Sequence, residues 1–449
     1  MTAVTRIMVS FQGEGSGAGE LSWGQREIWA AMRSQQSALP VGGCLPLPQG
    51  TTLDDMAAEL RFNMGRHQSM RTRLCFDADG RPTQVIAASG ETALEVVEAG
   101  ADDPAEVGER VRRRFCDTAY DYAAEWPLRM AVVTSAGVPT HVVAVFHHLV
   151  TDGFGSRVIM SDLAGRDPVT GAAGSPPPLL QPLEQARWQA SPAGLRQHEM
   201  SMRHWEGLLW AIPARRFPGS ADHREPRYWE GELTSPAMGL AVRLIAARTG
   251  ADTGAVLLAA FGVALARTTG ISPAVVRAVV SNRFRPGLAD VVSPVNQTSL
   301  CVLDVAGAGF DEVVRRTRQR ATAAYKYAYY DPDGLAELLA RVERERGEPL
   351  DVGCFFNDRR VRFRDGSGPV PTAEQVRELA ADSGFRWLRQ QKEPFERLFV
   401  HVEDVPDSLV LTVCGDTWHV SPADLRSCLL AMESVTVGAA LDPAACTGV

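Results

Sequence analysis

The chain lacks several patterns that mark familiar classes of protein. It contains no CxxC pair, and its eight cysteines are scattered at positions 44, 75, 116, 301, 354, 414, 428 and 446 of 449 residues. Zinc and redox motifs need closely paired cysteines, so we expect these to be reduced, small apolar residues. HxxxH and HExxH spacings are absent too. The sequence therefore predicts no metal site.

An excess of basic charge is also missing. The formal net charge is −8 and the isoelectric point is near 5.7. Without a basic stripe to neutralise phosphates, nucleic acid is not an expected partner. The N-terminus has no apolar core of the signal-peptide kind, and the most apolar stretch, 255–266, is too short to cross a bilayer. We expect a cytoplasmic protein with no membrane partner, and a buried helix at 255–266.

The length of the chain exceeds what one hydrophobic core usually serves, which predicts two domains. Residues 164–182, rich in proline, glycine and small side chains, are the best candidate for a linker. We therefore place one domain at 1–170 and a second at 171–449. Helical and strand patterns alternate in both halves, which predicts an α/β (α+β) fold and is compatible with a pseudo-symmetric pair.

Individual elements follow from local patterns. Thr52 and Asp55 form a possible capping box ahead of apolar residues at helical spacing. The stretches 73–76 and 83–88 flank a turn and predict a hairpin. The remaining predicted elements are a helix at 106–116, strands at 129–134 and 141–147, long helices near 186–210 and 236–269, a strand at 274–280 and a final helix at 422–432.

The segment His147-His148-Leu149-Val150-Thr151-Asp152-Gly153 carries the strongest signal in the chain. It follows the apolar run 142–146, where a strand is expected to break into a loop. Neighbouring side chains on a strand point to opposite faces, so one histidine should be buried and the other presented. Imidazole, with a pKa near 6.5, suits proton transfer around neutral pH. We expect His147 to be the buried residue and His148 the presented one, which points to acyl transfer.

The acid and the glycine of this segment open a second element. The apolar spacing of residues 154–163 predicts a helix, and a carboxylate at Asp152 can cap its free N–H groups or pair with an arginine. A structural role for Asp152 is therefore expected rather than that of an acid catalyst. Gly153 leaves room for a substrate to approach the backbone closely.

These motifs, taken together, resemble the condensation domains of nonribosomal peptide synthesis, from the superfamily of acyltransferases that includes chloramphenicol acetyltransferase. The HHxxxDG motif at 147–153 is complete. Two departures are a glycine at position 24, where the family has alanine, and Gln68 in place of an acid. The other matching segments are LSWGQREIW at 21–29, RHQSMRT at 66–72, WPLR at 126–129, SNR at 281–283 with VNQT at 295–298, and weaker echoes at 329–332 and 353–357.

The resemblance implies a fold and a chemistry. The fold is two chloramphenicol-acetyltransferase-like lobes in a V-shaped pseudo-dimer with a central tunnel. The donor is an acyl or aminoacyl thioester on the phosphopantetheine arm of a carrier protein, with no permanently bound cofactor. His148 would act as base or as positioner of the nucleophile. The Gly153 N–H is a candidate oxyanion donor. Asp152 would pair with Arg283, or with Arg71 as the second choice.

Several alternatives stay open. An acyl-coenzyme-A-dependent O- or N-acyltransferase shares HxxxDG, and a non-catalytic platform that binds carrier protein is possible. A heterocyclising relative is disfavoured because no DxxxxD replaces the histidines, and an epimerising one because no EGHGR-like glutamate lies near 281–283. The acceptor, amine or alcohol, is left undetermined. If the chain is full length, we expect a free-standing enzyme that meets its carrier protein in trans. A monomer is expected because a two-lobed pseudo-dimer already buries the surface that simpler trimeric relatives use between subunits.

Overall fold

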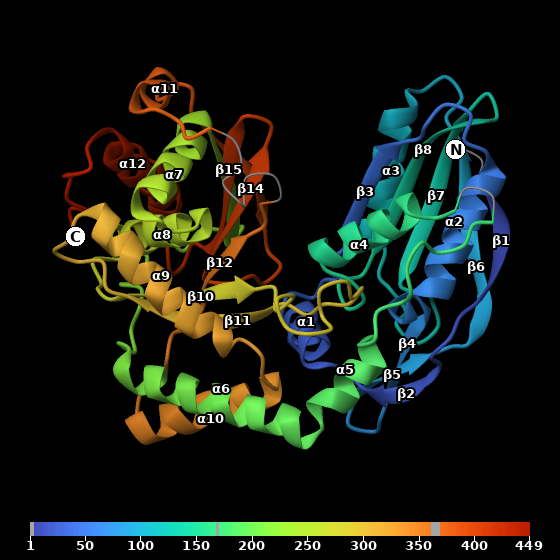
Figure 1. The fold of residues 1–449 in the computed structure, drawn as a ribbon, viewed down its shortest axis with the longest axis horizontal. Helices are drawn as coiled ribbons and strands as arrows, with labels where there is room; N and C mark the ends of the chain where they lie inside the picture. The colour runs from blue at the N-terminus through green and yellow to red at the C-terminus, as the bar shows by residue number, and fades with distance from the viewer. Residues whose placement is uncertain (1–3, 168–169, 361–368) are drawn as a thin grey trace. The chain divides into compact units, whose positions relative to one another are not determined.

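The chain forms two compact units in the computed structural model, which describes residues 4–167, 170–360 and 369–449 (Figure 1). The first unit holds Met1–Arg196 and Ser281–Asn296, and the second holds Gln197–Val280 and Gln297–Val449. The observed division therefore differs from the predicted boundary at 170/171. Positions 168 and 169 of the predicted linker lie outside the described residues.

Side-chain contacts explain why the residues after the linker stay with the first unit. The backbone N–H of Gln68 donates to the side-chain oxygen of Gln181 at 2.8 Å, and that of Trp23 donates to Gln189 at 2.9 Å. A shift in composition marks an exposed coil, whereas membership of a unit is decided by contacts of this kind. The composition of 164–182 could not reveal them.

The first unit is built on a mixed sheet. Within the described residues its strands run in the order β1-β6-β7-β8-β3, with β6 and β7 parallel and the other pairs antiparallel, and a smaller sheet has the order β2-β5-β4. The predicted hairpin is present as β4 and β5. The strands are β1 (Val4–Gln12), β2 (Gly17–Glu20), β3 (Val41–Pro46), β4 (Thr72–Phe76), β5 (Pro82–Ile86), β6 (Ser89–Glu98), β7 (Leu128–Ser135) and β8 (Val138–Phe146).

Helices cover both faces of the larger sheet. On one face α2 and α4 bury Leu60 and Ile159 against strand residues such as Leu94, and on the other α3 buries Val111 against Val133. The capping box predicted at the start of α2 is present. The helices of this unit are α1 (Trp23–Ser34), α2 (Leu53–Arg66), a 3-10 turn (Gln68–Arg71), α3 (Pro104–Asp117), α4 (Gly153–Ala164) and α5 (Pro182–Gln189).

The second unit contains a larger mixed sheet. Its strands, among the described residues, run in the order β11-β10-β12-β14-β15-β9-β13, and β12 is parallel to both of its neighbours. The strands are β9 (Tyr228–Ser235), β10 (Ala274–Val280), β11 (Gln297–Leu303), β12 (Cys354–Asp358), β13 (Gly384–Gln391), β14 (Leu398–Val405) and β15 (Ser408–Asp416). The predicted strand at 274–280 coincides with β10.

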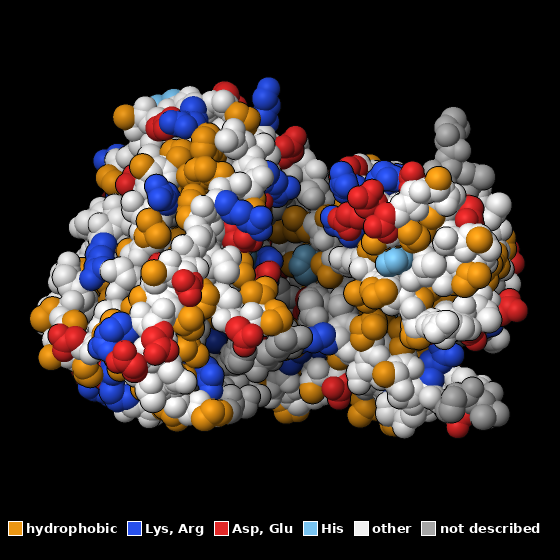
Figure 2. Space-filling model, turned by 90° about the horizontal axis from the view of Figure 1, so that it is seen from above, with side chains coloured by type: hydrophobic (Ala, Val, Ile, Leu, Met, Phe, Trp, Pro, Cys, Tyr) orange, Lys and Arg blue, Asp and Glu red, His pale blue; other side chains and the backbone are white. Residues whose placement is uncertain are grey.

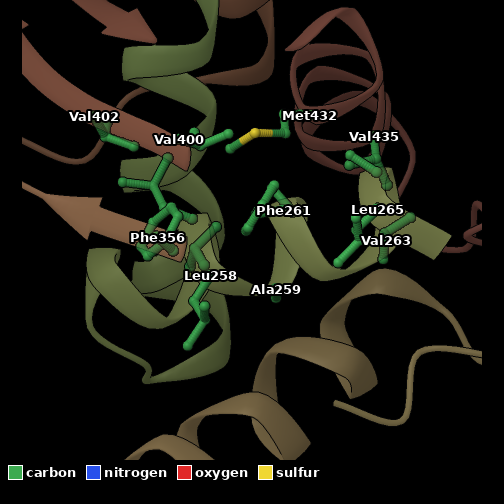
Figure 3. Close-up of a cluster of buried hydrophobic side chains, with 14 of the residues drawn as sticks. Leu258, Ala259, Phe261, Val263, Leu265, Phe356, Val400, Val402, Met432 and Val435 are labelled. Carbon is green, nitrogen blue, oxygen red and sulfur yellow. The ribbon is translucent and has the colours of Figure 1, made fainter. Parts of the chain in front are cut away.

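One buried helix organises the core of this unit. Phe261 of α8 lies among Phe356, Val400 and Met432, which come from β12, β14 and α12 (Figure 3). The apolar stretch 255–266 is buried throughout, as predicted. The helices are α6 (Pro192–Ala211), α7 (Pro236–Thr249), α8 (Thr253–Thr269), α9 (Phe310–Lys326), α10 (Pro332–Arg346), α11 (Ala373–Glu378) and α12 (Pro422–Leu441).

Both long predicted helices are in fact pairs. The stretch 186–210 is divided between α5 and α6, and 236–269 between α7 and α8, which are bent by 110°. Gly250, with a φ of 66°, ends α7 in the left-handed conformation, and Asp252 caps α8 by accepting the N–H of Ala255 at 2.8 Å. Apolar residues on both sides of the bend pack in the same core, and this concealed the break.

Among the described residues, no single helix is long and apolar enough to cross a membrane. The bent pair α7 and α8 passes the same test of length and composition only when the two helices are taken together.

Candidate active site

The HHxxxDG segment forms the turn between β8 and α4. Strand β8 ends at Phe146, one residue before the predicted end, because the next backbone groups leave the sheet. The N–H of His147 donates to the Pro127 carbonyl at 3.3 Å, and that of His148 to the Ala38 carbonyl at 3.0 Å. The two histidines therefore lie in the turn after β8. Their different surroundings result from this turn and not from the alternation of side chains along a strand.

His147 is a core residue, as predicted. It is only 4% exposed, and its ring meets the rings of Tyr120 and Tyr122 edge-on, with centroids 5.0 and 5.2 Å apart. Burial, and next the positive charge of Arg129, lower the pKa of His147 to about 3. The ring is therefore neutral near neutral pH and does not act as an acid there.

The ring of His148 makes a hydrogen bond that sets its tautomer. Its Nδ1 lies 2.8 Å from the carbonyl oxygen of Thr151, and the side chain is partly buried. Because a carbonyl oxygen only accepts hydrogen bonds, Nδ1 must carry the proton. In the neutral ring Nε2 is then the basic nitrogen. The turn thus prepares one nitrogen of His148 to accept a proton.

Asp152 performs both of the structural roles that the sequence offered as alternatives. Its Oδ1 accepts the N–H of Gly155 at 2.7 Å, which caps α4, and the same oxygen lies 2.7 Å from Nη2 of Arg283. The side chains of this ion pair are 6% and 8% exposed. The predicted pair with Arg283 is therefore present and nearly buried.

Arg283 reaches the turn because the segment Ser281–Asn296 follows β10 yet belongs to the first unit. Its guanidinium also donates to the carbonyls of Ala289 and Val291 at 3.1 and 2.8 Å. Asn282 precedes it in the left-handed conformation, with a φ of 56°. The guanidinium of Arg283 therefore binds both the backbone of this segment and the carboxylate of Asp152.

Arg71, the second choice of partner, is placed elsewhere. Its fully buried guanidinium donates to the backbone carbonyls of Gly13, Glu14 and Ala87. It therefore holds the polypeptide around β1 and β5 rather than the carboxylate of Asp152. The structure corrects the suggestion that Arg71 pairs with this acid.

The glycines of the turn differ in what surrounds them. A Cβ at Gly153 would meet nothing within 4 Å, whereas a Cβ at Gly155 would lie 2.5 Å from Oγ1 of Thr151. Gly155 is therefore the sterically required glycine, and open space lies beside Gly153. The departure at Gly24 also has a cause, since a Cβ there would clash with the carbonyl oxygen of Pro294.

Sequence reasoning missed the residues that hold the histidines. Tyr120 and Tyr122 surround His147, and Thr151 orients His148. The only available signal was a pair of tyrosines just ahead of the quoted WPLR segment. Their contact with the histidine depends on strand pairing that no local pattern encodes.

The described residues contain no group of three or more histidine, cysteine or acidic side chains that could hold a metal ion. Acidic and basic side chains are interspersed on the face shown in Figure 2, rather than gathered in one large patch of a single sign.

A family model described as "Condensation domain" matches residues 19–357. The chain is 28% identical over 354 residues to an isonitrile lipopeptide synthase of Mycobacterium tuberculosis, which covers 74% of this chain and 14% of that protein. It is 26% identical over 287 residues to tyrocidine synthase 3 of Brevibacillus parabrevis, covering 62% of this chain and 4% of that one. The chain thus spans a small fraction of these long relatives.

Solved structures share the fold. A condensation domain that mediates chain release from the enacyloxin polyketide synthase has a TM-score of 0.73 at 21% identity, covering 96% of this chain and 84% of its own. SgcC5 of Streptomyces globisporus has 0.69 at 19%, covering 95% and 100%. The X-domain from teicoplanin biosynthesis has 0.71 at 16%, covering 97% and 98%. The predicted α/β fold with two sheet-based lobes is confirmed.

Proposed function

The chain belongs to the condensation-domain family, and on this premise we propose that it transfers an acyl or aminoacyl group from a carrier-protein thioester to an amine or an alcohol. The observation that carries the proposal is the hydrogen bond between Nδ1 of His148 and the Thr151 carbonyl, which makes Nε2 the basic nitrogen. A base prepared in this way suits a reaction in which the nucleophile must lose a proton.

The proposed step has a simple balance. The nitrogen or oxygen of the acceptor attacks the thioester carbonyl, the new C–N or C–O bond forms, and the C–S bond breaks. Nε2 of His148 receives the proton of the acceptor, which then passes to the departing phosphopantetheine sulfur. Because a free amine attacks a thioester readily, orientation by His148 is expected to matter as much as proton removal.

The other motif residues support this step. The N–H of Gly153, at the first position of α4, is the proposed donor to the oxyanion, since helix N-termini favour negative charge. The open space beside Gly153 suits an approaching substrate. Asp152 and Arg283 hold the turn through a nearly buried ion pair, so we propose them as positioning residues.

The test is detection of the product by intact mass. A carrier protein bearing an acyl-phosphopantetheine arm is incubated with the enzyme and a panel of amines and alcohols. Alcohols belong in the panel because the SgcC5 structure contains an aryl 1,2-ethanediol. We expect transfer by the wild type and a loss of about 100-fold or more in His148→Gln. The matched control is His141→Gln, which changes a histidine of β8 whose Nδ1 lies 3.2 Å from Oγ1 of Thr140.

The remaining outcomes decide between functions. Transfer from acyl-coenzyme A without carrier protein would favour the coenzyme-A-dependent alternative. Absence of transfer from either donor, by protein that binds the carrier, would favour a binding platform. The second alternative has a specific basis, because the X-domain with the same fold was solved in complex with OxyB. Transfer by His148→Gln at the wild-type rate would contradict the role of this residue.

A further inference from the structure

We propose that Arg129 is a positioning residue for the transfer reaction: it holds the segment 115–125 so that Tyr120 and Tyr122 confine His147 and thereby set the place of His148. The inference rests on the proposed function, because it concerns where the proposed base is held. Its foundation is a chain of contacts inside the first unit that leads from Arg129 to the turn.

The guanidinium of Arg129 acts as a multiple clamp. Nη1 donates to the carbonyls of Phe115 and Thr118 at 2.7 and 2.6 Å, and Nη2 donates to that of Ala119 at 2.8 Å. Nη2 and Nε also reach the carboxylate of Glu125, at 3.0 and 3.3 Å. The side chain is 12% exposed. Its planar guanidinium therefore holds both ends of the segment 115–125 together. Three rotating donors of a lysine cannot reproduce this pattern.

The clamped loop carries the two tyrosines. The guanidinium carbon of Arg129 lies 3.6 Å above the ring centroid of Tyr120, and the hydroxyl of Tyr120 donates to the Val145 carbonyl at 3.2 Å. The carbonyl of Tyr122 accepts the N–H of Leu74 at 2.7 Å. Tyr120 is thus tied to β8 through its hydroxyl and Tyr122 to β4 through its backbone, and both rings meet the imidazole of His147 edge-on.

Backbone contacts transmit the position of His147 to the next residue. The carbonyl of His147 accepts the N–H of Val150 at 3.4 Å, and its N–H donates to the carbonyl of Pro127, two residues before Arg129. His147 is therefore the start of the turn that presents His148. A displacement of about 1 Å at a reacting group can cost on the order of 100-fold in rate.

Charge and geometry at Arg129 have separable consequences. The charge contributes, after burial, to the low pKa of His147, together with the neighbouring His148. Tyr120 and Tyr122 also face this ring, and Glu125 forms an ion pair with Arg129. Arg129→Lys keeps a positive charge but loses the fork, whereas Arg129→Met loses both.

The experiment compares these two variants by kinetics and by NMR. We expect kcat to fall by about 10- to 100-fold in both, with KM for donor and acceptor changed by less than about threefold, because position is lost rather than binding. In labelled protein the pKa of His147 should rise in Arg129→Met and stay nearer the wild-type value in Arg129→Lys. Tyr120→Phe, which loses only the hydroxyl contact, should give a smaller fall in kcat.

Two control variants separate positioning from stability. Arg114→Met removes an exposed arginine that pairs with Glu95 near the same loop and should leave kcat unchanged. Val97→Ala removes buried packing from the same sheet and should lower the Tm without lowering kcat in folded protein. A wild-type kcat in Arg129→Lys would overturn the inference. It would also be overturned if Val97→Ala, with the same Tm as the Arg129 variants, lost as much kcat as they do. Failure of the proposed function is seen separately, as absence of carrier-dependent transfer by the wild type or as transfer that does not depend on His148.

Discussion

At the residue scale, one carboxylate organises the turn. Asp152 caps α4 and also pairs with Arg283, with both groups nearly withdrawn from water. A buried ion pair is not by itself strongly stabilising, but removing one partner leaves an unpaired buried charge that costs about 3–5 kcal/mol. We therefore interpret the ion pair as fixing the conformation of the turn rather than as adding net stability to the fold.

A double-mutant cycle measures this coupling. Arg283→Met leaves the charge of Asp152 unpaired and should lower the free energy of unfolding by about 3 kcal/mol or more. Asp152→Asn keeps a good capping side chain, so its effect comes mainly from the lost ion pair. The double variant should be less destabilised than the sum of the two single variants, as measured by urea unfolding. Strictly additive losses would show that the two side chains are not coupled.

At the element scale, the start of α4 depends on two glycines with opposite requirements. Glycine weakens a helix by about 1 kcal/mol relative to alanine, so local propensity favours replacing both. Packing opposes this at Gly155, where the added Cβ would meet Thr151, but not at Gly153. The first turn of α4 thus combines one glycine demanded by packing with another that faces open space.

The two glycines make a matched experiment. Gly155→Ala should lower both the Tm and the transfer rate, because Thr151 must move and its carbonyl orients His148. Gly153→Ala should keep or slightly raise the Tm while lowering the transfer rate, since the methyl group occupies the proposed path of the substrate. Unchanged transfer by folded Gly153→Ala would argue against an approach of the substrate at this position.

Helix ends differed in how well the sequence predicted them. The capping box of α2 was recognisable because Thr52 and Asp55 are three residues apart and their contacts are local. The break between α7 and α8 was missed although Gly250 and Asp252 carry the signals of a helix end and a helix start. Apolar residues on both sides of the break face the same core, and their periodicity outweighed the two local signals.

At the scale of the whole molecule, the first unit depends on a distant segment. Ser281–Asn296 supplies Arg283 to Asp152, Val292 to the core under α2 and α4, and Pro294 to the contact with Gly24. A chain cut after the last residue of the N-terminal part therefore lacks a piece of its own core. The unit is continuous in space but not in sequence.

Fragments test this dependence. A fragment of residues 4–196 should be unstable, because Asp152 would remain buried without its cation and Val292 would leave a gap in the core. Joining residues 281–296 to it through a flexible glycine-serine linker should raise the Tm substantially, as measured by circular dichroism. Arg283→Met in the joined fragment should remove much of that gain. Equal stability of the two fragments would show that the segment is dispensable for folding.

The amino-acid sequence alone determined the family, the HHxxxDG turn, the capping of α2 and the partnership of Asp152 with an arginine, because residue types at short spacings carry these properties. Tertiary structure alone decided how Arg283 reaches Asp152 from a distant segment, which tyrosines confine His147 and where the units divide. These properties depend on strands and segments that meet after a long separation in sequence. Hydrophobic burial draws such segments together, and no local pattern records the partners they find.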